Sequence, residues 1–395
     1  MQAVKTNIMP KKLTYSVIHT IRDFQMLEDR WNDLLNWCPH HTVFQTWEWQ
    51  FTWLEIFQKE PYVILAFKGD EPVAVLPFFR INLTVFHILR LIGAPDSDYL
   101  DLIIRKGFEE QVLRLFFLEI LNRERSVGIV ELHSINEASP VFSFIHETPL
   151  NNFEIAFTEK ICPYVRLPQT WDKYLNSLSS STRYLIRRKQ KKLGADFSVN
   201  VGFARTQDEF EKRMADFILQ HQKRWINLQQ PGAFARRKFT AFHQKVGKKL
   251  FQKGWVKLYF LELDNYPVAS YYLFYYKNSL FYYLSGFDPK YEKYSPGVIL
   301  MGKIIKDAIQ DGRDEFDLMR GNTAYKFNWT SNKRINHTFI LERKIAAVTL
   351  YTSVVDISNK VSKITRRNLP KPITSILKKS FLNRILNHFD PLFKD

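Results

Sequence analysis

Residues 268–330 restrict the fold of this chain more than any other stretch, because strand, turn and helix signals follow one another there without interruption. The stretch reads VASYYLFYYKNSLFYYLSGFDPKYEKYSPGVILMGKIIKDAIQDGRDEFDLMRGNTAYKFNWT. Two apolar runs around a turn predict a hairpin, and Ser295-Pro296-Gly297 then predicts the start of a helix. Gly312 ends this helix, and residues 314–318 follow as a short strand. The order is typical of an α/β fold.

The start of the predicted helix after Ser295 also indicates a binding site. The first backbone N–H groups of a helix have no partner within it, and the helix dipole adds partial positive charge there. A strand that leads into such a helix therefore forms a site for anions. We expect residues 295–298 to bind a donor substrate that carries phosphate.

Hydrophobic periodicity predicts the other elements. A helix is expected over 44–57, and its three tryptophans favour packing in a core over stacking on a ligand. The basic helix 183–193 should stop at Gly194. Separate strands are expected over 99–104, 153–157 and 164–167.

A short internal echo suggests two related halves. Asp70-Glu71-Pro72-Val73-Ala74 opens the second strand of one predicted hairpin, and residues 264–269, DNYPVA, open the second strand of another. Turn chemistry alone also favours such residues. The length of 395 residues suffices for two cores. We predict domains over 1–160 and 161–343, followed by a tail over 344–395.

The net charge of +17 predicts an anionic partner: a nucleotide cofactor, RNA, an acidic glycan or an anionic lipid. The helix 183–193 carries much of this charge, and Arg183, Arg187 and Lys191 share one face of it. We expect this face to bind phosphate of the donor or acceptor, with RNA binding as the competing explanation. Two cysteines, Cys38 and Cys162, and an N-terminus without an apolar segment predict a cytoplasmic protein.

Two motifs carry a family resemblance. The order G-x-D-P-x-Y-x-x-Y-S-P-G-x-x-L, followed by E-F-D-x-x-R-G-x-x-x-Y-K-x-x-W, resembles GNAT-type acyltransferases of the CelD/BcsL-like group, which are related to the Fem peptidyltransferases. The resemblance implies tandem GNAT-like domains with mixed central sheets flanked by helices, plus a basic helical tail. It also implies transfer from acyl-CoA, acetyl-CoA first of all, to an amine of a sugar or another polysaccharide or envelope precursor.

The resemblance assigns roles to particular residues. The donor is expected along the strand 280–285 and at the helix start, where it contacts Tyr283, Ser285, Ser295, Gly297 and Val298. Residues 292–297 keep one glycine of the R/Q-x-x-G-x-G/A signature, and the Fem relatives use aminoacyl-tRNA on the same fold. A Fem-type donor is therefore the first alternative, and a non-enzymatic adaptor of a polysaccharide synthase is the second.

Fewer sequence features indicate which residues bind the acceptor and catalyse the transfer. Tyr325 is expected to protonate the leaving thiolate. Asp98 and Asp101 are candidates for the base or for groups that bind the acceptor, although surface carboxylates are the commoner explanation of such residues. Arg320, Lys326 and Trp329 are expected to bind substrate. A salt bridge from Arg320 to Asp317 or Glu315 is an equally good explanation of that arginine. No metal motif is present, and the chemistry requires no metal.

The tail 344–395 differs from the rest in having ten Lys and Arg against three acidic residues. Its apolar residues recur at helical spacing in two stripes: Val354, Ile357, Val361 and Ile364, and then Ile373, Ile376, Leu377, Phe381 and Ile385. The pattern predicts amphipathic helices. They either dock on the second domain or attach the protein to an anionic membrane.

Overall fold

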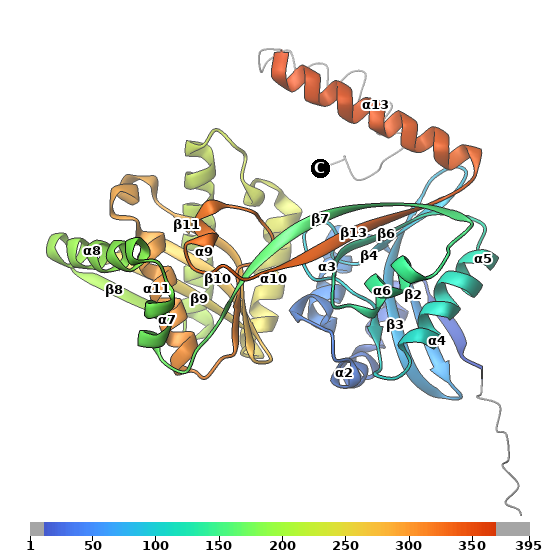
Figure 1. Ribbon diagram of the computed structural model, residues 1–395, viewed down its shortest axis with the longest axis horizontal. Coiled ribbons are helices and arrows are strands. Elements are labelled where there is room, and N and C mark those ends of the chain that lie inside the picture. Colours follow the sequence, from blue (N-terminus) through green and yellow to red (C-terminus); the bar gives the residue numbers. More distant parts are fainter. Residues whose placement is uncertain (1–11, 369–395) are drawn as a thin grey trace, which may run out of the picture.

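The computed structural model describes residues 12–368, with side chains up to residue 357. Two α/β halves lie side by side and are joined by two long strands, β7 (Phe153–Arg166) and β13 (Lys333–Arg343), which cross from one half to the other (Figure 1). Within the described residues the strands form a 13-stranded mixed sheet in the order β1-β2-β3-β4-β6-β13-β7-β12-β11-β10-β9-β8, with β5 paired to β3. The predicted α/β class with mixed sheets and flanking helices is confirmed.

The first half contains the hairpin β2–β3 and the parallel pair β4–β6. Thr46 starts the predicted tryptophan helix by accepting a hydrogen bond from the Trp49 N–H, and all three tryptophans of this helix are buried. Its elements are β1 (Thr14–Ile18), α1 (Ile21–Gln25), α2 (Glu28–Trp37), α3 (Trp47–Phe57), β2 (Glu60–Lys68), β3 (Glu71–Asn82), β4 (His87–Leu91), β5 (Ile103–Ile104), α4 (Glu109–Arg114), a π-helical turn (Leu115–Ile120), α5 (Leu121–Arg123), β6 (Val127–Asn136) and α6 (Pro140–Glu147).

The second half contains the hairpin β9–β10 and the parallel pair β11–β12. Its elements are α7 (Trp171–Ser177), α8 (Ser180–Asp196), β8 (Val199–Phe203), α9 (Gln207–Asn227), α10 (Arg237–Gln252), β9 (Val256–Leu263), β10 (Tyr266–Tyr276), β11 (Ser279–Phe287), α11 (Pro296–Gln310), β12 (Glu315–Asp317) and α12 (Ala324–Phe327).

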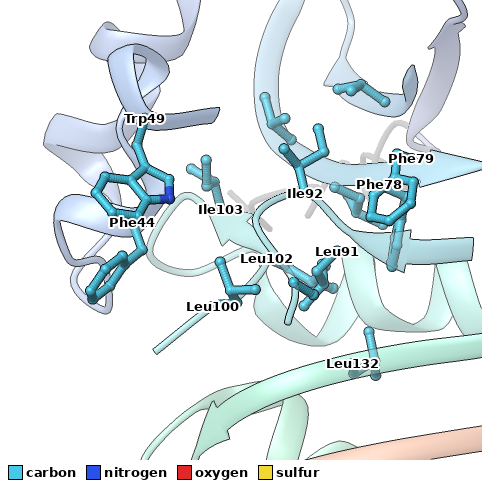
Figure 2. Packing of buried hydrophobic residues seen from close by; sticks show 14 of the residues in the cluster. Phe44, Trp49, Phe78, Phe79, Leu91, Ile92, Leu100, Leu102, Ile103 and Leu132 are labelled. Atoms are coloured by element: carbon cyan, nitrogen blue, oxygen red, sulfur yellow. The ribbon is translucent and has the colours of Figure 1, made fainter. Parts of the chain in front are cut away.

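The tyrosine-rich strand β10 separates two cores. Because successive side chains of a strand point to opposite faces, Tyr272 and Phe274 join one cluster with α9 and α10, while Tyr271 and Leu273 join another with α11. The first cluster continues into the first half, where Trp49 packs edge-on against Phe274 at 5.3 Å between ring centroids. Figure 2 shows part of it, with Phe44 and Trp49 of the first half among buried leucines and isoleucines. One apolar core therefore holds the two halves together.

Three sequence predictions about these elements are wrong. The two strands predicted over 153–157 and 164–167 form one strand, β7, which ends at Arg166, because its polar middle from Thr158 to Lys160 pairs with β13 while remaining exposed. Of residues 99–104, the strand β5 takes Ile103 and Ile104 alone, since Tyr99 has a φ of 52° that no strand permits. The helix α8 continues through Gly194 to Asp196.

The end of the described chain is the helix α13 (Ala346–Asn368), which projects away from the sheet (Figure 1). The predicted stripe from Val354 begins on this helix. The second predicted stripe, from Ile373 to Ile385, lies outside the described residues. Within residues 12–368, no helix is both long and apolar enough to cross a membrane.

Candidate active site

An opening between β11 and β12 positions the site. The two strands pair in parallel from Ser279 to Phe281 of β11, and β11 then runs on to Phe287 beside β10. Beyond Phe281, β12 has ended, so in the described part of the chain β11 has a strand neighbour on one side only. Two cavities occupy this opening.

The first of these, the α11 cavity, has a volume of about 350 Å³. Ser295 precedes α11 with a left-handed φ of 54°, and no side chain caps the helix start. The hydroxyl of Tyr271 donates to the carbonyl of Gly297 at 3.1 Å and so fixes this turn. The cavity is lined by Arg224, Tyr271, Tyr282, Ser285, Gly286, Phe287, Glu292, Ser295, Pro296, Gly297, Val298 and Tyr325. Four predicted donor-binding residues therefore lie together at a helix N-terminus that suits an anion.

The second cavity, which we call the Asp98 cavity, has a volume of about 390 Å³ and lies where the two halves meet. The first half contributes Asp96 and Asp98 from the loop after β4, and the second half contributes the end of α9, the start of α10, β11 and the loop after β12. Both cavities are lined by Arg224, Tyr282, Ser285 and Tyr325. They are consequently adjoining compartments that share one wall.

Asp98 forms an ion pair with Arg320 across the boundary of the halves. Its Oδ1 atom lies 2.9 Å from Nε of Arg320, and Arg320 also donates from NH1 to the carbonyl of Pro95 at 3.1 Å. Asp98 is 4% exposed, and among the described residues its Oδ1 atom accepts no well-aligned hydrogen bond. Burial raises the pKa of Asp98, and the positive charge of Arg320 opposes that rise. This carboxylate can therefore accept a proton.

The sequence left open a structural role for Arg320, a salt bridge to Asp317 or Glu315. Both of these predicted partners are wrong. Glu315 and Asp317 both pair with Arg334. Arg320 instead lies at the end of β12, where it faces the first half.

Tyr325 lies at the shared wall and starts a short chain of hydroxyl groups. It donates to Tyr282 at 2.9 Å, and the Tyr282 hydroxyl is 2.6 Å from Oγ of Ser285. Burial of the hydroxyl, with the adjacent Tyr282, raises the pKa of Tyr325 well above its ordinary value. Tyr325 therefore keeps its proton at neutral pH and acts as a hydrogen-bond donor at the shared wall.

Lys326 lines the Asp98 cavity, where it also has a structural role. Its Nζ donates to the carbonyls of Met319 and Arg320 at 3.1 and 2.8 Å, and burial lowers its pKa. Gly321 has a φ of 128°, and a Cβ atom there would lie 3.3 Å from this Nζ. The lysine thus holds the loop that carries Arg320.

Tyr283 lies in a different cavity from the one expected. It borders the Asp98 cavity and donates to the carbonyl of Asp96 at 2.9 Å. Side chains alternate along β11, so Tyr283 cannot share the orientation of Tyr282. It positions the loop that carries Asp98.

Other predicted site residues lie away from both cavities. Trp329 is 3% exposed in the core beside α11, and its carbonyl accepts from Tyr174 at 2.9 Å. Arg183 donates to the carbonyl of Leu178, and Arg187 is exposed on α8. The apolar side of α8 packs against α11, which leaves its cations facing outward.

Asp101 also faces elsewhere. It is buried within the first half, where it accepts the Leu102 N–H at 2.8 Å, and burial raises its pKa to about 7. A tiny cavity beside it is bordered by Cys38, His40 and Glu109.

Sequence reasoning missed Arg224 and Arg236. Arg236 pairs with Asp96 at 2.8 Å. The guanidinium of Arg224 lies over the Phe287 ring, and NH1 is 3.5 Å from Oγ of Ser285. Arg224 belongs to α9 and Arg236 directly precedes α10. The patterns of both helices resemble ordinary solvated faces, so only the fold brings these residues to the site.

Comparisons with known proteins agree with this geometry. Residues 180–327 match the family model described as an acetyltransferase (GNAT) domain, which covers α8 to α12 and therefore most of both cavities. No curated protein matches the chain. The second half of the protein is therefore similar to an acetyltransferase (GNAT) domain.

Three solved structures share the fold over most of the chain. The crystal structure of FemX has a TM-score of 0.61 at 11% identity, over 86% of this chain and 99% of the other. A protein of unknown function from Bacteroides thetaiotaomicron has a TM-score of 0.53 at 10% identity, over 84% and 100%. The C-terminal domain of a putative lysylphosphatidylglycerol synthetase from Agrobacterium fabrum has 0.51 at 11%, over 85% and 96%.

Proposed function

We propose that the protein transfers an acyl group, acetyl in the simplest case, from acyl-CoA to the amine of a sugar or other polysaccharide or envelope precursor in the cytoplasm. The observation that carries this proposal is the shared wall between the two cavities. Transfer between two bound molecules requires adjoining sites, because the reacting atoms must be held about 3 Å apart.

The α11 cavity suits the donor. The N-terminus of α11 would hold the phosphates, and the free edge of β11 after Phe281 offers backbone groups to the pantetheine arm. The thioester would then lie at the shared wall beside Tyr282 and Ser285.

The Asp98 cavity suits the acceptor. Trp225 and Phe239 supply flat apolar faces for a ring, while Asp96, Asp98, Arg236 and Arg320 supply polar contacts. This combination is typical of sites for small polar molecules.

The residues at these sites suffice for direct attack. The neutral amine attacks the thioester carbonyl carbon and loses one proton to Asp98, while Tyr325 gives one proton to the departing thiolate. An amide and free CoA result, and the proton returns from Asp98 to Tyr325 through solvent. Arg320 supports the step by keeping Asp98 ionised.

A thermal-shift screen with acetyl-CoA, longer acyl-CoAs, CoA and tRNA tests the donor, because a ligand of the native state raises the melting temperature. We expect acyl-CoA to raise it, and thiol release with a panel of amino sugars to follow. A shift with tRNA and none with any CoA species would overturn the proposal.

One observation favours an aminoacyl-tRNA donor as the second candidate. Arg187, Arg188, Lys191 and Lys192 form an exposed basic surface on α8. Nζ of Lys189 donates to the carbonyl of Lys293 at 2.8 Å, which ties this helix to the loop before Ser295. A steep fall of tRNA affinity with salt would support this candidate. The adaptor alternative predicts binding without thiol release.

A further inference from the structure

The helix α13 is attached to the body through its first turns. Val348 is buried, and a Cβ atom at Gly128 would lie 2.8 Å from it, so the helix sits directly on β6. Tyr351 packs edge-on against Phe86 at 5.6 Å between ring centroids. The later turns stand clear of the sheet (Figure 1). One side of the helix is thus committed to the body and the other is free.

The free side carries a row of apolar side chains. Leu350 is 67% exposed and Ile357 is 61% exposed, and Val354 lies between them in the sequence. Spacings of four and three residues place all three on one side of a helix, and in the sequence Val361 and Ile364 continue the same spacing. Single exposed leucines are ordinary, whereas a continuous row of them marks an interaction surface.

The charges beside this row indicate what covers it. Within α13 the sequence places Lys360, Lys363, Arg366 and Arg367 against a single acidic residue, Asp356. These four cations all lie in the second half of α13, after the single acidic residue. A parallel pair with a second copy would bring these like-charged segments together. An anionic surface complements them instead.

We propose that the free side of α13 docks on an anionic lipid surface. The apolar row enters the boundary between headgroups and acyl chains, and the net positive charge of the same helix attracts it to the lipid phosphates. Each cation near such a surface strengthens binding roughly fivefold at low salt. The inference is independent of the proposed acyl transfer, because α13 lies outside both cavities.

Cosedimentation of the full-length protein with vesicles tests the proposal. We expect binding to vesicles of phosphatidylcholine with about one third phosphatidylglycerol, and at least tenfold weaker binding to pure phosphatidylcholine or at high salt. Leu350→Ser with Ile357→Ser should weaken binding at least tenfold, because both side chains leave the lipid. Replacing Lys360, Lys363, Arg366 and Arg367 by Gln should do the same.

The matched control is Met26→Ser with Val85→Ser, which removes two apolar side chains of the first half that are more exposed than the tested pair, at 80% and 71%. It should leave vesicle binding unchanged. Equal melting temperatures of all variants would show that each is folded. Vesicle binding that is unaffected by the α13 variants would overturn the proposal. A second result would also overturn it: a parent protein that binds no vesicles but forms a dimer in light scattering, with the α13 variants monomeric.

Discussion

The two halves of the molecule have the same strand arrangement and different tasks. In each, a hairpin is followed by a third antiparallel strand and then by a parallel fourth: β2, β3, β4 and β6 in the first half, and β9, β10, β11 and β12 in the second. Counted inward from either end of the sheet, equivalent strands occupy the same positions, and β13 and β7 lie at the centre. The echo between residues 70–74 and 264–269 therefore marks equivalent turns.

The difference lies in how far the third strand extends beyond its parallel neighbour. In the first half β4 ends at Leu91, one residue beyond its pairing with β6, and the buried Ile92 and Leu100 follow in the core. In the second half β11 continues past its pairing with β12, and two cavities fill the opening. In the first half, the loop after β4 instead carries Asp96 and Asp98 into the lining of the Asp98 cavity. Strand length thus decides which half contains the opening with the two cavities.

The largest effect is expected from Asp98, whose ion pair with Arg320 joins the two halves. Asp98→Asn removes the proposed base, so transfer should fall by about 10²–10⁴ while donor binding stays the same. In the parent protein kcat/KM should rise with pH through the raised pKa of Asp98, because only the ionised form accepts a proton. Steady-state kinetics and CoA titration measure both. Asp101→Asn is the control, since Asp101 faces the first half, and equal losses in both variants would contradict the assignment.

Arg320→Ala should have the next largest effect. Without the guanidinium, burial raises the pKa of Asp98 further, so less of the carboxylate is ionised at neutral pH and transfer falls about 10–100-fold. The rate should recover as the pH is raised. Arg320→Lys keeps the charge and should lose less. A loss that does not depend on pH would show that Arg320 acts on substrate rather than through Asp98.

Gly297→Asp tests the donor half. A carboxylate beside the N-terminus of α11 repels phosphate, so CoA should bind about tenfold more weakly or worse, which corresponds to about 1.4 kcal/mol. Ser143→Asp adds the same charge to the exposed face of α6 in the first half and should change nothing. Calorimetric titration with CoA distinguishes the two. Unchanged affinity in Gly297→Asp would move the donor elsewhere.

The smallest effect concerns stability alone. The pKa of Asp101 is raised to about 7 in the folded protein, so the folded state binds more protons than the unfolded state between about pH 4 and 7, and stability falls as pH rises through that range. Asp101→Asn can still accept the Leu102 N–H and should be more stable than the parent at pH 8, by about 1–4 kcal/mol. Urea denaturation at pH 5 and pH 8 measures this. A variant less stable at both would show that the carboxylate is needed as an acceptor.

The sequence by itself determined the local elements and one side of the site. Apolar periodicity, the Thr46 cap and the Ser295-Pro296-Gly297 start depend on neighbours a few residues apart, so α3, the hairpins and α11 could be predicted. The α11 cavity follows from the same short stretch, because β11, the turn and the helix start are adjacent in the chain. The predicted residues Ser285, Ser295, Gly297 and Val298 therefore lie together.

Only the tertiary structure decided the other side. Asp98 and Arg320 are 222 residues apart, and their ion pair exists because β7 and β13 cross between the halves and set the loop after β4 against the end of β12. Trp329 and Arg183 have the residue types of a binding site, yet packing against α11 and α7 directs them elsewhere. Arg224 shows the converse, because it lines both cavities although the sequence pattern of its helix α9 is that of an ordinary solvated helix. The identity of each side chain follows directly from the sequence. The residues that the side chain contacts depend on how segments that are distant in the chain pack together.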